Sequence, residues 1–577
     1  MTDPSLLRQG GSLLLALLLC AAPARADVAL PAIFGTHMVL QQGQTLPVWG
    51  TAAPGEAVAV TLGAQTAKTT ADSAGKWRID LKPISAAQPL TLTVAGKNTL
   101  SFTDVLAGDV WVCSGQSNME FPLHGAHDAT TEIPKADEPQ IRLFLVTKKT
   151  ALQPQTDVKA AWVVCSPATV GNFSAVGYFF GRTLQHELHR PIGLIGTYWG
   201  GTPAQAWTSL AGLQQPPPFA HYVEQYQSVL SAYPDNLAKY PALAAAYQQD
   251  LKQWNDTVGK TYQPVLAQWS ADVAKAQAAG QPAPPKPAPS TLQPKAPAPP
   301  EGGPNTPTVL YNGMIAPLVP FAIKGAIWYQ GESNAGNGPE YATLFPRMIT
   351  TWRTAWGEGD FPFLFVQLAN FMKPQEKPSE GGWALLREAQ FKTLALPKTG
   401  MAVIIDIGDG GNIHPKDKHD VGERLALVAR HVAYGEKLVS SGPLYDAMKV
   451  EGHAIRLSFT HTGSGLKIGA APWSPTGPPP AVGSELTGFA IAGADKNWAW
   501  AKAKIEGDDV IVSSDQVPSP VAVRYGWANN PPCNLYNKED LPASPFRTDT
   551  WTDAPPKPMA SAAPATPSAP APVPPKP

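Results

Sequence analysis

Short apolar runs that alternate with helix-like stretches constrain the fold of residues 105–437 more than any other feature of the chain. The runs are bounded by small and polar residues, as in strands buried inside a sheet. In 174–189 the apolar residues follow helical spacing instead. Strands that alternate with helices predict an α/β fold with a mostly parallel sheet. The expected strands are 110–113, 192–201, 322–329, 363–368 and 402–405.

Polar or small residues follow directly after most of these strands. Ser117, the pair Gly200 and Gly201, Gln330 and Asp406 all have this position. The carboxyl ends of parallel strands meet at one edge of a sheet, and ligand sites of α/β folds lie there. The sequence therefore predicts an active site at this edge.

Ser117 lies in the stretch DVWVCSGQSNMEF, residues 109–121, where a strand turns into the next element. A serine there can be a nucleophile, because the first N–H groups of the following helix point at the group that it attacks. It can also simply cap the helix, which is the commoner role of such a serine. The G-x-S-x-G pattern of α/β-hydrolases is not met, since Met119 stands where its second glycine would be.

His414 ends the stretch DIGDGGNIH, residues 406–414, and precedes Pro415. Proline is favoured in the first helical turn, so a helix is expected from there to about Tyr434, with His414 at its N-terminus. The helix macrodipole disfavours a charged imidazole at that end and favours a histidine that accepts a proton. His414 is thus a better candidate for the general base than His419, which is expected within the helix.

Gly200 and Gly201 end an expected strand, and glycine allows the backbone to approach a ligand closely. Their N–H groups are therefore candidate donors to a developing oxyanion. A plain turn explains the pair equally well.

The flanks of the α/β region have different patterns. Alternating apolar residues predict a β-sandwich region over 27–104 and a second β domain over 438–552, expected to pack on the first. The α/β pattern, 105–230 and 306–437, is interrupted at 231–305 by two amphipathic helices and a proline-rich linker. Residues 553–577 are rich in proline and alanine and are expected to be disordered.

Residues 1–26 are typical of an export signal. Arg8 precedes an apolar run, and Ala24-Arg25-Ala26 fits the small-x-small cleavage pattern. The run is too short for a membrane span, so periplasmic or secreted protein is expected. Cleavage there leaves three cysteines, an odd number, which are interpreted mainly as small buried apolar residues: Cys113, Cys165 and Cys533.

The charge distribution argues against nucleic acid as a partner. The formal net charge is −1, and no stripe of Lys and Arg is present. The 17 tryptophans are compatible with a sugar ligand, although most are expected in the core. No Cys and His spacing indicates a zinc site.

Several motifs together resemble the sialate O-acetylesterase family, a branch of the SGNH hydrolases that is also similar to xylan and other polysaccharide acetylesterases. These motifs are SGQSNME (114–120), YWGGTPAQAW (198–207), WYQGESNA (328–335), IHPKDKHDVGERLA (413–426) and NLYNKEDLPASPFRT (534–548). The resemblance implies a three-layer α/β/α catalytic domain with β-sandwich appendages. It also implies removal of O-acetyl groups from carbohydrate by serine chemistry, without a metal or other cofactor.

The resemblance also implies roles for single residues. Ser117 would be the nucleophile, with an acetyl-Ser117 intermediate, and His414 the general base. The oxyanion hole would take the N–H groups of Ser117 and of Gly200 or Gly201. A side-chain amide would complete it, from Gln330 or else Asn334, while Glu332 would orient the loop.

One position departs from the wider SGNH pattern, which has an aspartate three residues before the histidine. Gly411 stands there in this chain. The group that orients His414 would then be Asp409, with Asp406 or a backbone carbonyl as alternatives.

Three functions remain open at this point. The first is a carbohydrate O-acetylesterase acting on sialic acid or on plant polysaccharides such as xylan and xyloglucan. The second is an esterase of broader specificity for small or lipid esters. The third is a carbohydrate-binding protein whose esterase site has decayed. The sequence indicates no oligomeric state.

Overall fold

The structure, a computed structural model, describes residues 27–551 apart from residues 86, 218, 279–283, 379 and 476. The expected export signal, 1–26, and the expected tail, 553–577, lie outside the described residues. Across the described part of the chain, no helix is both long and apolar enough to cross a membrane.

A parallel sheet forms the centre of the molecule, in the strand order β13-β12-β11-β7-β10-β8-β9. Only β9, at one edge, runs antiparallel to its neighbour. The residues of β10, β11 and β12 are all buried, which explains why these strands are apolar without alternation. The strands are β7 (Thr99–Gly115), β8 (Glu138–Leu145), β9 (Trp162–Cys165), β10 (Ile192–Tyr198), β11 (Gly325–Tyr329), β12 (Phe363–Val366) and β13 (Thr399–Ala402).

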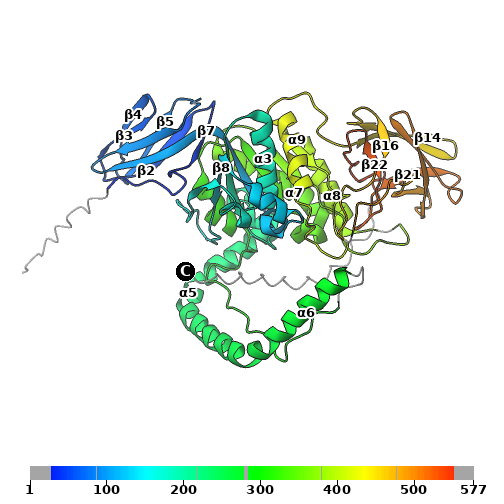
Figure 1. The fold of residues 1–577 in the computed structure, drawn as a ribbon, viewed down its shortest axis with the longest axis horizontal. Helices are drawn as coiled ribbons and strands as arrows, with labels where there is room; N and C mark the ends of the chain where they lie inside the picture. Colours follow the sequence, from blue (N-terminus) through cyan, green and yellow to red (C-terminus); the bar gives the residue numbers. More distant parts are fainter. Residues whose placement is uncertain are drawn as a thin grey trace, which may run out of the picture.

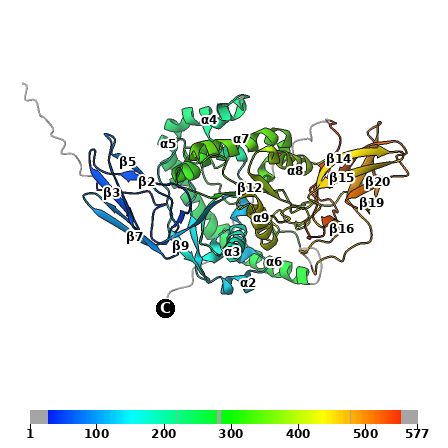
Figure 2. The same cartoon turned by 90° about the horizontal axis from the view of Figure 1, so that it is seen from above.

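Helices cover both faces of this sheet, as Figure 2 shows. On one face α3 (Ala175–Leu188) and α9 (His419–Val432) lie side by side, and on the other lie α7 (Gly338–Trp356) and α8 (Gly382–Lys392). The rings of Trp111 on β7 and Phe180 on α3 meet edge to face on the first side, and Trp328 on β11 stacks on Phe345 of α7 on the second. The expected three-layer α/β/α arrangement is confirmed.

The N-terminal β region and the central sheet share β7. Its first half pairs with β6, and its second half pairs with β10 and β11. The strand therefore continues across residues 104 and 105, and its buried residues belong to one core with the central sheet. The other strands of this region are β1 (Val39–Gln41), β2 (Leu46–Thr51), β3 (Ala57–Leu62), β4 (Gln65–Thr70), β5 (Lys76–Leu81) and β6 (Leu90–Ala95).

The C-terminal β region has a core of its own, between two four-stranded sheets. It lies at the opposite end of the molecule from the N-terminal region (Figure 1), so the expectation that the two pack together is wrong. The central α/β layers separate them. Its strands are β14 (Leu444–Glu451), β15 (Ala454–Thr460), β16 (Leu466–Ile468), β17 (Phe489–Gly493), β18 (Trp498–Trp500), β19 (Lys502–Glu506), β20 (Asp509–Ser513), β21 (Pro520–Tyr525), β22 (Leu535–Asn537) and β23 (Phe546–Arg547).

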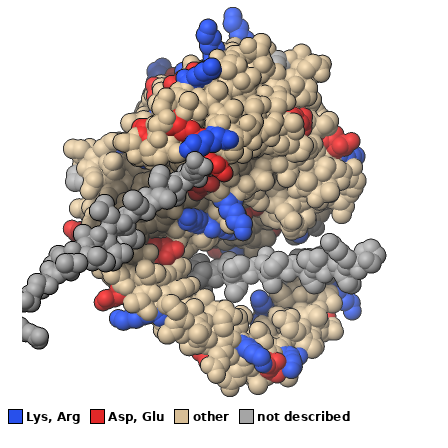
Figure 3. Space-filling view, turned by 90° about the vertical axis from the view of Figure 1, so that its left-hand side faces the viewer, with Lys and Arg blue, Asp and Glu red and all other residues tan. Residues whose placement is uncertain are grey.

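A helical arm projects from the body (Figures 1 and 3). It follows α4 (Leu210–Gln214) and consists of α5 (Ala220–Trp254), a π-helical turn (Asn255–Gly259) and α6 (Lys260–Ala278). The proline-rich segment returns along these helices, because their aromatic side chains donate to its carbonyl groups. The donor and acceptor pairs are Trp269 with Pro284, Tyr262 with Pro287 and Trp254 with Thr291.

Several element boundaries differ from expectation, and two of them lie on either side of the loop that contains His414. Strand β13 ends at Ala402, and α9 begins at His419 rather than next to Pro415. Between them, polar side chains bond to nearby backbone N–H groups and favour turns over helix. The Asp409 carboxylate accepts from the N–H of Gly411, and Asp417 accepts from the N–H of Asp420 in the first turn of α9.

Candidate active site

Ser117 is the first residue of α1 (Ser117–Glu120), a single helical turn directly after β7. Gly115 permits this turn, since its φ is +137° and a Cβ atom there would come within 2.2 Å of the Tyr329 carbonyl oxygen. The N–H of Gln116 donates to that same carbonyl at 3.0 Å. The first N–H groups of a helix have no partner inside it, so the N–H of Ser117 is a donor at the sheet edge.

His414 lies against this serine, with 2.8 Å between its Nε2 atom and Oγ of Ser117. Burial lowers the pKa of His414, and the charge of Lys418 lowers it further, against a smaller opposing effect of Glu120. A neutral imidazole at this distance can accept the serine proton. The expected help from a helix macrodipole is absent, because α9 begins only at His419.

Neither candidate aspartate lies within hydrogen-bond distance of His414. Asp409 bonds the N–H of Gly411 at 2.8 Å. Asp406 is held in a bidentate ion pair with Arg424, at 2.6 and 2.8 Å. Within the described ranges, no carboxylate bonds Nδ1 of His414; the loop is fixed instead by the His414 N–H, which donates to Oδ1 of Asn412 at 3.0 Å.

Gly200 lies beside Ser117, as expected of a donor to the oxyanion. A Cβ atom on Gly200 would be 3.2 Å from Cβ of Ser117. Its N–H, however, donates to Oε2 of Glu120 at 2.6 Å, and Lys148 donates to the other oxygen of this carboxylate at 2.5 Å. Gly201 follows with a φ of +74°, which turns the chain away from the strand.

The amide of Gln330 is buried and engaged. Its Nε2 atom donates to Oδ1 of Asn334 at 2.7 Å, and its Oε1 atom accepts from the hydroxyl of Tyr341 at 2.9 Å. Asn334 in turn accepts from the N–H of Ala204 and donates to Gln205. These two amides fasten the 330–337 loop to the 202–208 segment in this structure.

Three residues near Ser117 and His414 were not singled out from the sequence: Asn118, Glu120 and Lys418. Asn118 bonds both Glu332 and Lys418, and Glu120 bonds Gly200. All three belong to the SGQSNME or IHPKDKHD motifs. Their position as polar residues close to Ser117 or His414 in these motifs was the signal that could have indicated them.

Comparisons with known proteins identify the family. The model of the family described as carbohydrate esterase, sialic acid-specific acetylesterase matches residues 107–276 and 304–430. The chain belongs to this family. The sialate O-acetylesterase of mouse is 30% identical over 88% of this chain and 92% of its own length, and that of human is 32% identical over 74% and 75%.

The chain is also similar to a protein of known structure. The crystal structure of a carbohydrate acetylesterase from Xanthomonas citri is 38% identical, with a TM-score of 0.71, and the match covers 91% of this chain and 100% of that one. These findings identify the protein, a member of the sialate O-acetylesterase family, as a carbohydrate O-acetylesterase.

Three aromatic side chains of the esterase lie near Ser117, His414 or the loop that carries His414. The ring of Phe121 lies 6.4 Å from that of His414, and Lys148 lies over the partly exposed ring of Trp199 at 5.5 Å. From the C-terminal region, Trp473 reaches His127, with 6.0 Å between the rings. The N–H of His127 bonds the carbonyl of Lys416, so this tryptophan lies near the loop that carries His414.

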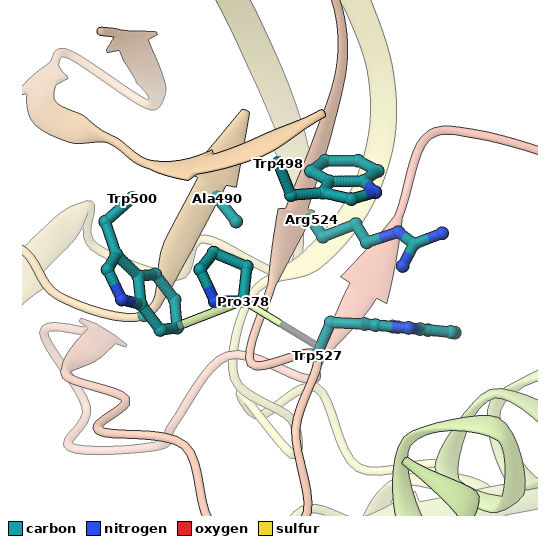
Figure 4. A pocket seen from close by; sticks show the side chains of 7 residues that line it. Pro378, Ala490, Trp498, Trp500, Arg524 and Trp527 are labelled. Atoms are coloured by element: carbon teal, nitrogen blue, oxygen red, sulfur yellow. The ribbon is translucent and has the colours of Figure 1, made fainter. Parts of the chain in front are cut away.

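A small crevice of the esterase lies in its C-terminal region, between β18, β21 and the loop of Pro378 (Figure 4). Arg524 lies between the rings of Trp498 and Trp527, 4.3 and 5.3 Å from their centres. The space left is about 10 Å³, room for about one water molecule. The guanidinium therefore occupies the ring faces that a sugar would need.

The described residues contain no group of three or more His, Cys, Asp or Glu side chains arranged to hold a metal ion. Cys113, Cys165 and Cys533 are free thiols, the first two of them buried.

Proposed function

We propose that the protein removes O-acetyl groups from carbohydrate through an acetyl-Ser117 intermediate. The 2.8 Å contact between Ser117 and His414 carries this proposal. Oγ attacks the acetyl carbonyl while Nε2 of His414 takes its proton, and this proton then goes to the departing sugar oxygen. His414 then takes a proton from water as the water oxygen attacks the acetyl carbonyl. The bond between this carbonyl carbon and Oγ of Ser117 breaks, His414 returns the proton to Oγ, and acetate is released.

For the oxyanion we propose the N–H groups of Ser117 and Gly200, with Gly201 as neighbour. The N–H of Gly200 becomes available when the substrate carbonyl displaces the Glu120 carboxylate, which Lys148 can retain. Gln330 and Asn334 support this oxyanion site indirectly, because their amides fix the 330–337 loop to the 202–208 segment that follows Gly200 and Gly201.

As substrate we propose a neutral acetylated polysaccharide, such as xylan or xyloglucan. Glu120 and Lys148 form an ion pair beside Ser117, so the cation there is already neutralised and is not free for the carboxylate of an anionic sugar. Lys418 and Lys148 each lie over one face of Phe121 and Trp199, so the other faces of these two rings, together with Trp473, are the ring surfaces proposed to contact a neutral sugar. O-acetylated sialic acid is the second candidate, favoured by the names of the mammalian relatives.

The protein acts outside the cytoplasm in this proposal, in the periplasm or the medium, because residues 1–26 have the pattern of an export signal.

Acetate release from acetylated xylan, acetylated xyloglucan and O-acetylated sialic acid tests the proposal, with the variants Ser117→Ala and His414→Ala. We expect release from the neutral polysaccharides and a loss of at least about 1000-fold in each variant, since a nucleophile or base lost from such a pair costs this much or more. Release from sialic acid alone would reverse the substrate assignment. No release from any of the three, with hydrolysis of p-nitrophenyl acetate retained, would favour the esterase of broader specificity.

A further inference from the structure

Lys418 is buried beneath the catalytic pair, with an exposed fraction of 0%. Its Nζ atom donates to Oδ1 of Asn118 at 2.6 Å and lies over the rings of Phe121 and Tyr329, 4.9 and 5.4 Å from their centres. Burial of an ammonium group without a direct ion pair is costly, so a lysine in this position calls for a reason.

The lysine fixes the orientation of the Asn118 amide. Nζ of a protonated lysine can only donate, so the atom of the Asn118 amide that faces it is the oxygen. The Nδ2 atom of Asn118 then points the other way, where it donates to Oε1 of Glu332 at 2.6 Å and to the carbonyl of Ile413 at 3.0 Å.

One amide thereby joins the two halves of the catalytic pair. Asn118 follows Ser117 on α1, and Ile413 precedes His414 in the loop before α9. The distance between Oγ and Nε2 depends on these two backbone segments, which are otherwise on separate elements.

Glu332 completes the group from the loop after β11. Its carboxyl is buried, and among the described residues its Oε2 atom has no hydrogen-bond partner. Burial raises the pKa of Glu332, against the opposing effects of Asn118 and the charge of Lys418.

We propose that Lys418, Asn118 and Glu332 are positioning residues that hold Ser117 and His414 in register, in place of a carboxylate on Nδ1 of His414. This role rests on the serine esterase function proposed above. None of the three touches the reacting atoms; they act through the backbone and through charge.

The charge of Lys418 adds a second effect on the base. Lys418 and Glu120 are the charged groups that face His414, and Lys418 disfavours the imidazolium. Burial lowers the pKa of Lys418 to about 7, while Glu332 and Asp417 act against this. The lysine is therefore protonated in the range below pH 6.5 where His414 titrates, and it extends the neutral form of the histidine to lower pH.

The test compares Lys418→Met with Lys416→Met, a matched control whose side chain is exposed in the same loop. The readout is the rate at which a fluorophosphonate labels Ser117, measured by intact mass from pH 5 to 9. In this reaction Oγ bonds to phosphorus, the P–F bond breaks, fluoride leaves and His414 takes the Oγ proton. The probe needs no sugar, so it reports on the catalytic pair whatever the substrate is.

For Lys418→Met we expect labelling to slow by at least about tenfold across pH 5 to 9, because Ser117 and His414 are no longer held in register. The acid limb of the profile should also move to higher pH, because the charge that disfavours the imidazolium is gone. On a released-acetate assay, kcat should fall while KM stays constant. Lys416→Met should keep the parental profile. A Lys418→Met protein with the parental profile and kcat overturns the proposal.

Glu332→Gln is the alternative variant where Lys418→Met does not fold, because it keeps an acceptor for Asn118 and removes the countercharge of Lys418. Without this countercharge the pKa of Lys418 falls further, so the lysine disfavours the imidazolium of His414 less. The acid limb should therefore move to higher pH here too, and an unchanged profile again overturns the proposal. A parent protein that labels but releases no acetate refutes the proposed substrate and leaves this inference standing. A parent protein that neither labels nor hydrolyses any ester refutes both.

Discussion

Two aspartates in one short loop have different surroundings. Asp406 has a side-chain exposure of 1%, pairs with Arg424, and accepts from the hydroxyl of Tyr536 in the C-terminal region at 3.0 Å. Asp409 accepts from the N–H of Gly411 within its own turn. The first carboxylate joins two parts of the molecule, and the second stabilises only a local turn.

The stability of two variants separates these roles. Asp406→Asn should lower the free energy of unfolding by about 3 kcal/mol, because it leaves Arg424 buried without a countercharge. Asp409→Asn should cost less than about 1 kcal/mol. Urea unfolding at pH 7 measures both, and kcat of each folded variant should stay within about tenfold of the parent. A loss near 10⁴-fold for Asp409→Asn would show that this carboxylate does orient His414 during turnover.

At this scale, the position of Ser117 directly after a strand of the central sheet could be predicted. His414 was chosen for its place before Pro415 at an expected helix start, although the helix begins only at His419. Whether the candidate oxyanion donors are free or already hydrogen-bonded could not be predicted. Whether the N–H of Gly200 is free depends on Glu120, 80 positions earlier in the chain, and whether Gln330 can donate depends on Asn334 and Tyr341. Such contacts arise only when the elements have packed.

At the scale of elements, the contact between α3 and α9 centres on His419, the first residue of α9. Its ring stacks on Phe179 of α3 at 4.4 Å, and it pairs with Asp128, just before α2 (Ala129–Glu132), and with Glu423. The hydrogen bonds to Asp128 and then Glu423 raise the pKa of His419 to about 10. Arg182, 3.1 Å from the same ring, acts against them but does not outweigh two carboxylates.

The pH dependence of the free energy of unfolding should reveal the charged form of His419 at the contact between α3 and α9. A raised pKa in the folded state means that His419 stabilises the fold fully below about pH 6.5, its ordinary pKa, and less as the pH rises towards 10. His419→Gln should therefore cost about 2 kcal/mol at pH 6 and clearly less at pH 9.5. Chemical unfolding at several pH values tests this, with His453→Gln, an exposed histidine, as control. A cost that does not change with pH would contradict the charged form of His419.

Element types were predictable where periodicity was strong, as in the central strands and in α3. The start of α9 was not, because Asp409, Asn412 and Asp417 make side-chain bonds to the backbone that compete with helix. Proline after a histidine indicated a helix start, but the local polar bonds delayed it to His419.

At the scale of the whole molecule, one arginine joins the catalytic layers to the C-terminal region. Arg387 on α8 is fully buried, and burial lowers its pKa to about 9. It donates to the carbonyls of Leu368 and Ala369 on one side and of Ala528 and Asn529 on the other.

Replacement of this arginine should loosen the whole molecule. Arg387→Ala removes four hydrogen bonds and leaves the buried carbonyls of Leu368 and Ala528 without a donor, so we expect a loss of at least about 3 kcal/mol in unfolding free energy. Lys392→Ala, an exposed lysine on the same helix, should change little. Thermal unfolding monitored by tryptophan fluorescence measures both, and a parental melting temperature for Arg387→Ala would contradict this role.

The order of the regions along the chain could be read from composition and alternation, but their arrangement in space could not. The two β regions lie at opposite ends because β7 and Arg387 attach each of them to a different side of the central layers. Neither attachment leaves a periodic pattern in the sequence.

The length of β7 gives the molecule a mechanical property. The strand is bonded into the N-terminal sheet along its first half and into the central sheet along its second, and it ends two residues before Ser117. Tension applied at the N-terminal region can therefore pass along this strand to the turn that presents Ser117. If the enzyme works while it is tethered to a polymer or a surface, part of the strain in the tether reaches the Ser117 turn through β7.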